Sequence, residues 1–302
     1  MQKKLIYYSI LTSSVICCLV GAFLLTGSLD PQSQDHLLSG GGQRIARAGQ
    51  SGLALAHHLP FTPTQKPLQL LPQPPVPISP FPTTLNEQVA VLQAKDRLFF
   101  SGNAKLPEVA LTFDDGPNPP YTNQVLALLK HYGIPATFFC VGKQVAAYPD
   151  LVKQEAAAGY TIANHTWTHP MLTSLSTSDI RDELSMTSDI IQKTTGVRPI
   201  YFRPPYGAYN ARVFTQLNQF GFTTFLWSDG SLDWTALRPA AISRQVLSHA
   251  ANGAIILMHD GGGDRSRTIA ALPSIIEGLQ ARHFRFVTLE QLVADAHMTP
   301  SV

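Results

Sequence analysis

The stretch Val109-Ala-Leu-Thr-Phe-Asp-Asp-Gly-Pro117 places two adjacent carboxylates directly after a short apolar run. The run Val109–Phe113 has the length and composition of a buried strand, whereas Asp-Gly-Pro is typical of a turn. Adjacent carboxylates at the mouth of a buried strand repel each other and are costly to desolvate unless a cation or a proton resolves the conflict. The stretch therefore predicts a strand that ends either in a simple turn or in a site with chemistry.

Beyond about Leu92 the chain keeps alternating short apolar runs with amphipathic stretches. We expect strands at Val109–Phe113, Ala136–Val141, Thr161–Asn164, Ile200–Arg203, Thr223–Trp227, Ala254–Met258 and Phe284–Thr288. We expect helices at Thr122–His131, Asp150–Ala158, Ser178–Thr194, Ala211–Phe220, Pro239–Ala250 and Ile269–Arg282. Repeated β-then-α order predicts a parallel sheet wrapped by helices, either an open doubly wound sheet or a barrel. Seven strands and six helices in roughly 200 residues favour a barrel over two domains.

Reactive side chains recur where the expected strands end. Parallel α/β folds build their active sites at the C-terminal ends of the strands. One such coincidence means little, but several separate ones predict a single convergent site. The residues concerned are Asp114 and Asp115 after the first strand, His165 after the third, Arg203 at the end of the fourth, Asp233 beyond the fifth and His259 after the sixth.

The segment His165-Thr-Trp-Thr-His169 has a spacing that is common among metal ligands. Two imidazoles four residues apart face the same way on a helix and can also converge from a tight loop. No Glu follows the first His, so the H-E-x-x-H pattern of metalloproteases is absent. Together with Asp115, the two histidines would complete a two-His, one-carboxylate set, which leaves positions open for water and substrate.

Taken together, these segments resemble the ordered motifs of the polysaccharide deacetylase family, carbohydrate esterase family 4, also called the NodB homology domain. The similarity spans about Val109 to Leu289. It implies a distorted (β/α) barrel, commonly seven-stranded, in a single catalytic domain. The five matching motifs are Thr112–Pro117, the His165/His169 pair, Arg203-Pro-Pro-Tyr-Gly207, Asp233-Trp234 and Leu257-Met-His259.

The resemblance implies roles for the residues at the first strand end and the histidine pair. Asp115, His165 and His169 would bind a divalent metal, most often Zn²⁺, with Co²⁺, Mn²⁺ or Ni²⁺ as alternatives. Asp114 would be the general base, and Arg203 would orient it.

The resemblance also implies roles on the opposite side of the site. His259 would be the general acid, tuned by Asp233. The backbone N–H of Tyr206 would contribute to the oxyanion hole, while Trp234 and Leu257 would line the acetyl pocket.

One position departs from the family pattern. Many relatives carry a further acidic residue three positions before the one that Asp233 occupies, where this chain has Gly230. Asp229 lies one residue earlier, and we leave it out of the predicted site.

The function implied by the resemblance is hydrolysis of the N-acetyl group of N-acetylglucosamine-type residues in a polysaccharide outside the cytoplasm. Peptidoglycan is the favoured substrate, followed by chitin-like oligomers or an exopolysaccharide. One alternative is a non-catalytic glycan-binding protein on the same fold, which predicts the loss of at least one reactive residue. Another is an esterase that acts on O-acetyl groups. The net charge of +2 and the lack of a dense Lys/Arg block give no support for a nucleic-acid partner.

The N-terminal part differs in composition from the rest. Lys3 and Lys4 precede the run Leu5–Gly27, which has no charged residue and is long enough to span a bilayer. We expect residues 1–27 to be an uncleaved signal-anchor and the remainder to lie in the periplasm or at the cell surface. The alternative is a cleaved signal and a secreted protein, although the run is longer than a usual signal core and lacks a small-x-small site near its end.

Residues 28–92 are expected to form a disordered stalk, because nine prolines fall between Pro60 and Pro82 and a Gly-rich spot precedes them. Residues 93–302 are expected to be the catalytic domain.

Overall fold

The computed structural model describes residues 85–95 and 97–298. The predicted anchor, residues 1–27, and most of the predicted stalk lie outside the described residues. In the part that is described, no helix combines the length and the apolar character needed to cross a membrane.

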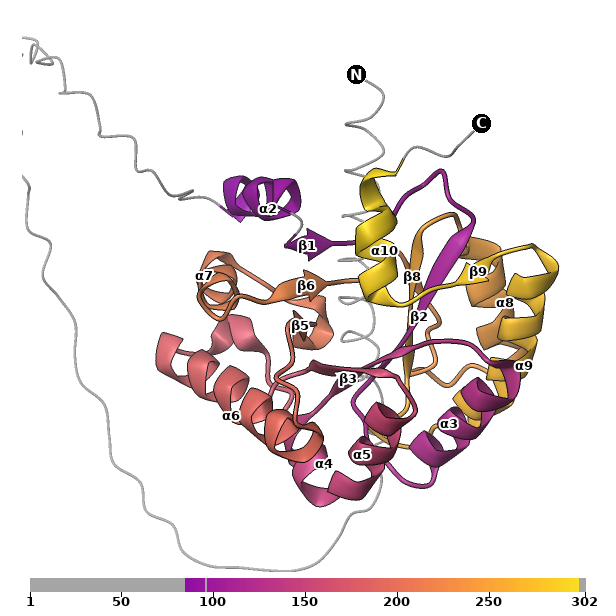
Figure 1. Ribbon diagram of the computed structural model, residues 1–302, viewed down its shortest axis with the longest axis horizontal. Coiled ribbons are helices and arrows are strands. Elements are labelled where there is room, and N and C mark those ends of the chain that lie inside the picture. The colour runs from indigo at the N-terminus through magenta and orange to yellow at the C-terminus, as the bar shows by residue number, and fades with distance from the viewer. Residues whose placement is uncertain (1–84, 96, 299–302) are drawn as a thin grey trace, which may run out of the picture. The chain divides into compact units, whose positions relative to one another are not determined.

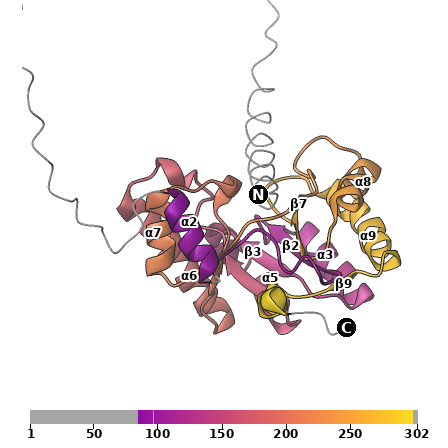
Figure 2. The same cartoon turned by 90° about the horizontal axis from the view of Figure 1, so that it is seen from above.

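One curved parallel sheet forms the centre of the domain (Figures 1 and 2). Its strand order is β1-β6-β5-β4-β3-β2-β8-β7, and β9 pairs with β2. An antiparallel bridge joins Ser101, just after β1, to Ala254 at the start of β8, which lies next to the other end of the strand order. The predicted distorted (β/α)7-type barrel is confirmed. The strands are β1 Leu98–Phe99, β2 Glu108–Asp114, β3 Thr137–Cys140, β4 Thr161–Asn164, β5 Tyr201–Phe202, β6 Thr223–Phe225, β7 Asp229–Gly230, β8 Ala254–His259 and β9 Arg285–Phe286.

Helices surround these strands, as Figure 2 shows from above. The six predicted helices are all present, with ends that differ by a few residues. The shorter α4 and α10, the strands β1 and β7, and α2 were not predicted. The helices are α2 Leu85–Ala94, α3 Tyr121–Tyr132, α4 Gly142–Ala147, α5 Pro149–Ala157, α6 Thr177–Thr195, α7 Ala211–Gln219, α8 Pro239–His249, α9 Ser266–Ala281 and α10 Leu289–Ala294.

Helix α2 lies largely within residues 28–92, the range predicted to form the stalk. Leu85, Val89 and Leu92 recur at helical spacing, so they form one apolar stripe. Leu92 is only 8% exposed, and the stripe packs against a hydrophobic cluster that includes Leu98 and Phe214. The last residues of the range assigned to the stalk therefore belong to the folded domain.

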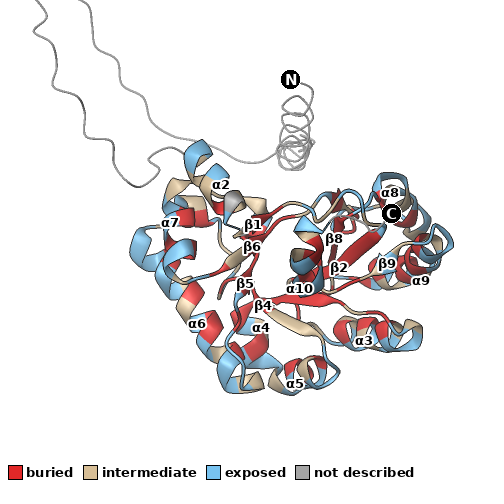
Figure 3. Ribbon diagram, turned by 45° about the horizontal axis from the view of Figure 1, so that its top comes forward, coloured by how far each residue is buried: buried red, intermediate tan, exposed pale blue. Residues whose placement is uncertain are grey.

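The core has one layer outside the sheet and one inside the barrel (Figure 3). On β2, Val109, Leu111 and Phe113 face the outer helices. Successive side chains of a strand point to opposite faces, so Ala110 points inward, and it packs there with α10 through Leu292. Asp114 lies on the same inward face, at the C-terminal end of the strand. Because side chains alternate along the strand, the Asp114 carboxylate points into the barrel at the C-terminal ends of the strands.

Candidate functional site

The first predicted site residues lie at the end of β2. Asp114 is the last strand residue, and Asp115 follows with a left-handed backbone, φ 72°. This turn separates the two side chains, although they are neighbours in the sequence. Adjacent carboxylates thus have different surroundings.

Asp115, His165 and His169 converge from two loops. One ligand atom of each lies within 4.8 Å of the others. Asp115 Oδ1 is 3.2 Å from His169 Nε2 and 3.6 Å from His165 Nε2. The same Oδ1 atom is buried and has no hydrogen-bond partner among the described residues. Two imidazoles and a carboxylate around an unsatisfied oxygen fit a divalent metal ion, because such ions bind this donor set.

The protonation of His165 also suits a ligand. Its Nδ1 donates to the backbone carbonyl of Arg203 at 2.7 Å, so the lone pair of the neutral ring lies on Nε2, which faces the carboxylates. Burial and the nearby His169 lower the pKa of His165 to about 3. Metal binding requires a neutral imidazole, and a hydrogen bond to the second ring nitrogen orients the ring.

Asp114 is paired with Arg203 inside the barrel. Arg203 Nη1 donates to Asp114 Oδ1 at 2.7 Å and to Thr112 Oγ1 at 2.9 Å, and the guanidinium is fully buried. The guanidinium also lies over the ring of Phe139, 4.1 Å from its centroid. Burial raises the pKa of Asp114, and Arg203 opposes that rise. This carboxylate is therefore fixed in place and more basic than an ordinary aspartate.

His259 and Asp233 form a second pair across the opening. His259 Nδ1 donates to Asp233 Oδ1 at 2.8 Å, and the His259 backbone N–H donates to Oδ2 at 2.9 Å. Burial alone would lower the pKa of His259, but the charge of Asp233 and its hydrogen bond outweigh it, so the pKa is raised. Burial would raise the pKa of Asp233, yet His259 and Arg265 lower it. The imidazole thus favours its protonated form, as a general acid requires.

The predicted substrate-binding residues are placed around these groups. The Tyr206 ring lies 4.6 Å from the His169 ring and the Trp234 ring 5.3 Å from the His259 ring, measured between centroids. Both side chains are exposed, at 52% and 43% respectively. Leu257 is buried on β8 beside β7. Two aromatic rings therefore flank the opening, one on each side.

Backbone strain is concentrated here. A positive φ is costly for a residue with a Cβ atom and tends to occur at functional sites. Six non-glycine residues in the described part have one, and five of them lie in the site motifs or next to them. These five are Asp115, Thr166, His169, Tyr206 and Leu232.

Some contributors could not be read from the sequence. Thr268 Oγ1 donates to Asp233 Oδ2 at 2.9 Å, and Arg265 donates to the backbone carbonyl of Asp233 at 3.3 Å. Both are buried near the start of α9. A Thr or an Arg near a helix start carries no motif, and only the packing of α9 brings them to the site.

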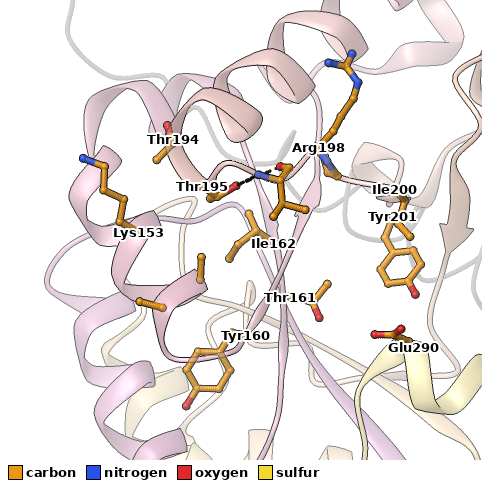
Figure 4. Close-up of a pocket in the computed structure, with 14 residues that line it drawn as sticks. Lys153, Tyr160, Thr161, Ile162, Thr194, Thr195, Arg198, Ile200, Tyr201 and Glu290 are labelled. Carbon is orange, nitrogen blue, oxygen red and sulfur yellow. Dashed lines mark hydrogen bonds between the residues drawn. The ribbon is translucent and has the colours of Figure 1, made fainter.

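A cavity of about 530 Å³ lies at the other end of the strands (Figure 4). It is lined at the starts of β4 and β5 by Thr161 and Tyr201, with Tyr160, Arg198 and Glu290 around them. None of the predicted site residues lines it. This cavity and the convergent polar groups are therefore separate features of the described residues.

The fold and this arrangement are those of a barrel hydrolase in which a candidate metal-ligand set accompanies an Arg203-bound carboxylate and an imidazole paired with Asp233. Residues 101–225 match the family model described as polysaccharide deacetylase. The chain belongs to this family, carbohydrate esterase family 4.

Two relatives and one solved structure illustrate the similarity. The chain is 40% identical over 191 residues to a peptidoglycan-N-acetylglucosamine deacetylase of Bacillus cereus, covering 63% of this chain and 89% of the relative. It is 38% identical over 194 residues to a chitooligosaccharide deacetylase of Rhizobium leguminosarum bv. trifolii, covering 61% and 90%. A crystal structure of a peptidoglycan N-acetylglucosamine deacetylase in complex with 4-naphthalen-1-yl-N-oxidanyl-benzamide matches with a TM-score of 0.65 at 34% identity, over 67% of this chain and 94% of that one.

Proposed function

We propose that this protein hydrolyses the N-acetyl group of N-acetylglucosamine-type residues in a polysaccharide outside the cytoplasm, in a metal-dependent reaction that releases acetate. One observation carries the proposal. The ligand atoms of Asp115, His165 and His169 converge around an unsatisfied buried oxygen, and the Arg203-bound Asp114 lies beside them. An amide is a poor electrophile with a poor leaving group, so both a base and an acid are needed.

Asp115, His165 and His169 would hold the metal. Zn²⁺ suits two imidazoles and one carboxylate with open positions, and Co²⁺, Mn²⁺ or Ni²⁺ are the alternatives. When bound, such an ion polarises the acetyl carbonyl and lowers the pKa of a water molecule toward about 7.

Asp114 acts as the general base. Its Oδ2 lies 3.6 Å from His165 Nε2, at the ligand set, while Arg203 holds Oδ1. The carboxylate takes a proton from the attacking water, and its raised pKa favours that transfer. Arg203 keeps the orientation constant during the transfer.

His259 acts as the general acid. Its Nδ1 donates a hydrogen bond to Asp233, so Nε2 delivers the proton to the departing sugar nitrogen. The products are acetate and a free amine, which becomes cationic at neutral pH. The Tyr206 backbone N–H would stabilise the oxyanion, and Trp234 and Leu257 would bound the acetyl group. One good oxyanion donor contributes roughly 3–4 kcal/mol.

Peptidoglycan is the substrate that we favour, and chitin-like oligomers or an exopolysaccharide come next. The Bacillus cereus relative, a peptidoglycan-N-acetylglucosamine deacetylase, supports this order, and the Rhizobium relative keeps the second option open. The uncharged run Leu5–Gly27 supports attachment to the membrane with the catalytic domain outside the cytoplasm. Fractionation of the full-length protein with membranes tests that part, and a mature protein that begins after residue 27 would contradict it.

The two alternatives differ in what they require of the site. A non-catalytic glycan-binding protein would tolerate the loss of reactive groups, yet the metal ligands, the base, the acid and their partners are all present and in contact. An O-acetyl esterase would use the same groups, so only the substrate distinguishes it.

Acetate release tests the function. The full-length protein is incubated with peptidoglycan, chitooligosaccharides and acetylated xylan, with and without a chelator. We expect release from peptidoglycan, abolished by the chelator and restored by Zn²⁺. Release that the chelator does not affect would reject the metal-dependent mechanism. Release from acetylated xylan alone would favour the esterase.

A further inference from the structure

The loop between the two histidines is held by a carboxylate from α6, the next α-helix along the chain. Glu183, on α6, accepts hydrogen bonds from the backbone N–H groups of Trp167 and Thr168, each at 2.8 Å. Its second oxygen accepts from Thr168 Oγ1 at 2.6 Å. All three donors lie between His165 and His169. One side chain therefore binds the segment between His165 and His169, whose conformation determines the distance between the two imidazole rings.

This segment has a backbone that needs such support. Thr166 and His169 both have left-handed φ angles, 69° and 59°, which residues with a Cβ atom adopt at a cost. The His169 N–H donates to Thr166 Oγ1 at 3.0 Å, which closes a tight turn. Hydrogen bonds to an ionised carboxylate are stronger than neutral ones, so Glu183 can offset the strain.

The opposite side of the loop is fixed as well. The backbone N–H groups of Gly142 and Lys143, at the start of α4, donate to the carbonyls of Thr166 and Trp167 at 2.9 and 3.1 Å. A Cβ atom at Gly142 would lie 2.3 Å from the Trp167 ring, so the helix packs directly on the loop. Helices α4 and α6 pack against each other (Figure 1). The loop is thus bound through its carbonyls by one helix and through its amides by the other.

We propose that Glu183 is a positioning residue for the metal site. It fixes the loop so that His165 and His169 present their Nε2 atoms toward Asp115 together. The inference rests on the metal site of the proposed function. Groups that orient metal ligands typically change metal affinity by about 10–100-fold when they are removed. Glu183 acts through the loop rather than on a ligand, so we expect the lower end of that range.

The test measures metal binding, not turnover. The full-length protein is stripped with a chelator, and Zn²⁺ is titrated in competition with a chromophoric chelator. Glu183→Gln keeps the shape but removes the charge, and we expect its Kd for Zn²⁺ to rise about 10-fold. Asp182→Asn, the exposed neighbour on the same helix, is the matched control and should leave the Kd unchanged.

Thermal unfolding with and without Zn²⁺ separates positioning from general stability. If Glu183 only stabilises the fold, Glu183→Gln lowers both Tm values equally, and the increment caused by Zn²⁺ stays at its wild-type size. A smaller increment supports the proposal, since metal stabilisation depends on affinity. A Kd within threefold of the Asp182→Asn control overturns it.

Two further variants complete the experiment. If Glu183→Gln does not fold, Thr168→Val removes only the hydroxyl contact and should raise the Kd about threefold; an unchanged Kd then overturns the proposal. His165→Ala tests the metal site itself. If it binds Zn²⁺ as well as the wild type, the proposed site fails. If it loses binding while Glu183→Gln does not, the inference on Glu183 fails alone.

Discussion

The two ends of the barrel differ in what they bury. At the C-terminal ends of the strands, Asp114, Arg203 and Asp233 are almost completely buried, and each has a charged partner at 2.7–2.8 Å. The cavity of about 530 Å³ lies at the N-terminal ends of the strands. Two cations that line it, Lys153 and Arg198, form ion pairs with exposed aspartates. The cations at this cavity thus remain in water, although the N-terminal end also buries Glu108, which pairs with the exposed Arg285 at 2.8 Å.

This difference shows that a cavity alone does not identify a site. Desolvating a charge is costly, so a protein retains several buried charges in one place only where they are paired or perform chemistry. A cavity whose charged groups remain in water needs no such explanation. The following variants test whether function and buried charge really coincide.

The largest effect is expected at the metal-ligand side of the C-terminal end. Asp114→Asn removes the base but leaves Asp115, His165 and His169 in place, so turnover should fall by about 10²–10⁴-fold while metal stays bound. His165→Ala should lose both metal and activity. Acetate release and metal content after dialysis measure the two properties. Activity that survives both changes would reject the assignment.

The acid side is expected to show a somewhat smaller effect with a pH signature. Asp233 raises the pKa of His259, so the imidazole stays protonated to a higher pH than an isolated one. Asp233→Asn removes that charge, which lowers the pKa of His259. We expect a turnover about 10²-fold lower at neutral pH and a basic limb of the kcat–pH profile that begins at lower pH. A profile that keeps the wild-type basic limb would show that this pair does not supply the acid.

The positions of these groups could largely be predicted from the sequence because strand ends are visible in it. Buried strands such as Val109–Phe113 and Ala254–Met258 are short apolar runs, and parallel strands share one C-terminal edge. Convergence of Asp115, His165 and His169 follows from that topology, and the motif order indicated the family.

Other features had no signal in the sequence. Strands β1 and β7 have two residues each and are defined only by pairing with neighbouring strands, so they are too short to show a periodic pattern in the sequence. Glu183 and Thr268 are polar residues within helices, indistinguishable from solvated ones until the helices pack. Helix α2 was not predicted because its apolar residues directly follow a proline-rich stretch.

Asp229, on β7, offers a contrast with Asp233. It is buried like Asp233, four residues later, but neither carboxylate oxygen has a hydrogen-bond partner among the described residues. Burial raises its pKa from 3.8 to about 7, opposed by the charges of His249 and Arg282. A carboxyl group with a raised pKa in the folded state contributes stability at low pH, which is lost as the pH rises through about 7.

Asp229→Asn should therefore stabilise the protein at alkaline pH. We expect a free energy of unfolding about 1–3 kcal/mol above wild type at pH 9 and a smaller difference at pH 5, because the loss of stability begins near the unfolded pKa of 3.8 and is complete above about 7. Urea unfolding at both pH values measures it. Asp233→Asn is the control with the opposite sign, because its lowered pKa adds stability at high pH. An equal effect of Asp229→Asn at both pH values would show that this carboxyl group does not titrate in the folded protein.

The smallest effect is expected at the N-terminal end. Ile200 lines the cavity and is 63% exposed, so Ile200→Lys adds a solvated charge without opening the core. Surface changes of this kind usually alter stability by less than about 0.5 kcal/mol, and we expect kcat/KM to change less than twofold on every substrate. The informative comparison is between a short oligosaccharide and a long polymer. A loss confined to the polymer would mean that the bound polysaccharide extends to this cavity. The catalytic groups would then lie at the C-terminal end alone, whereas both ends of the barrel would contribute to substrate binding.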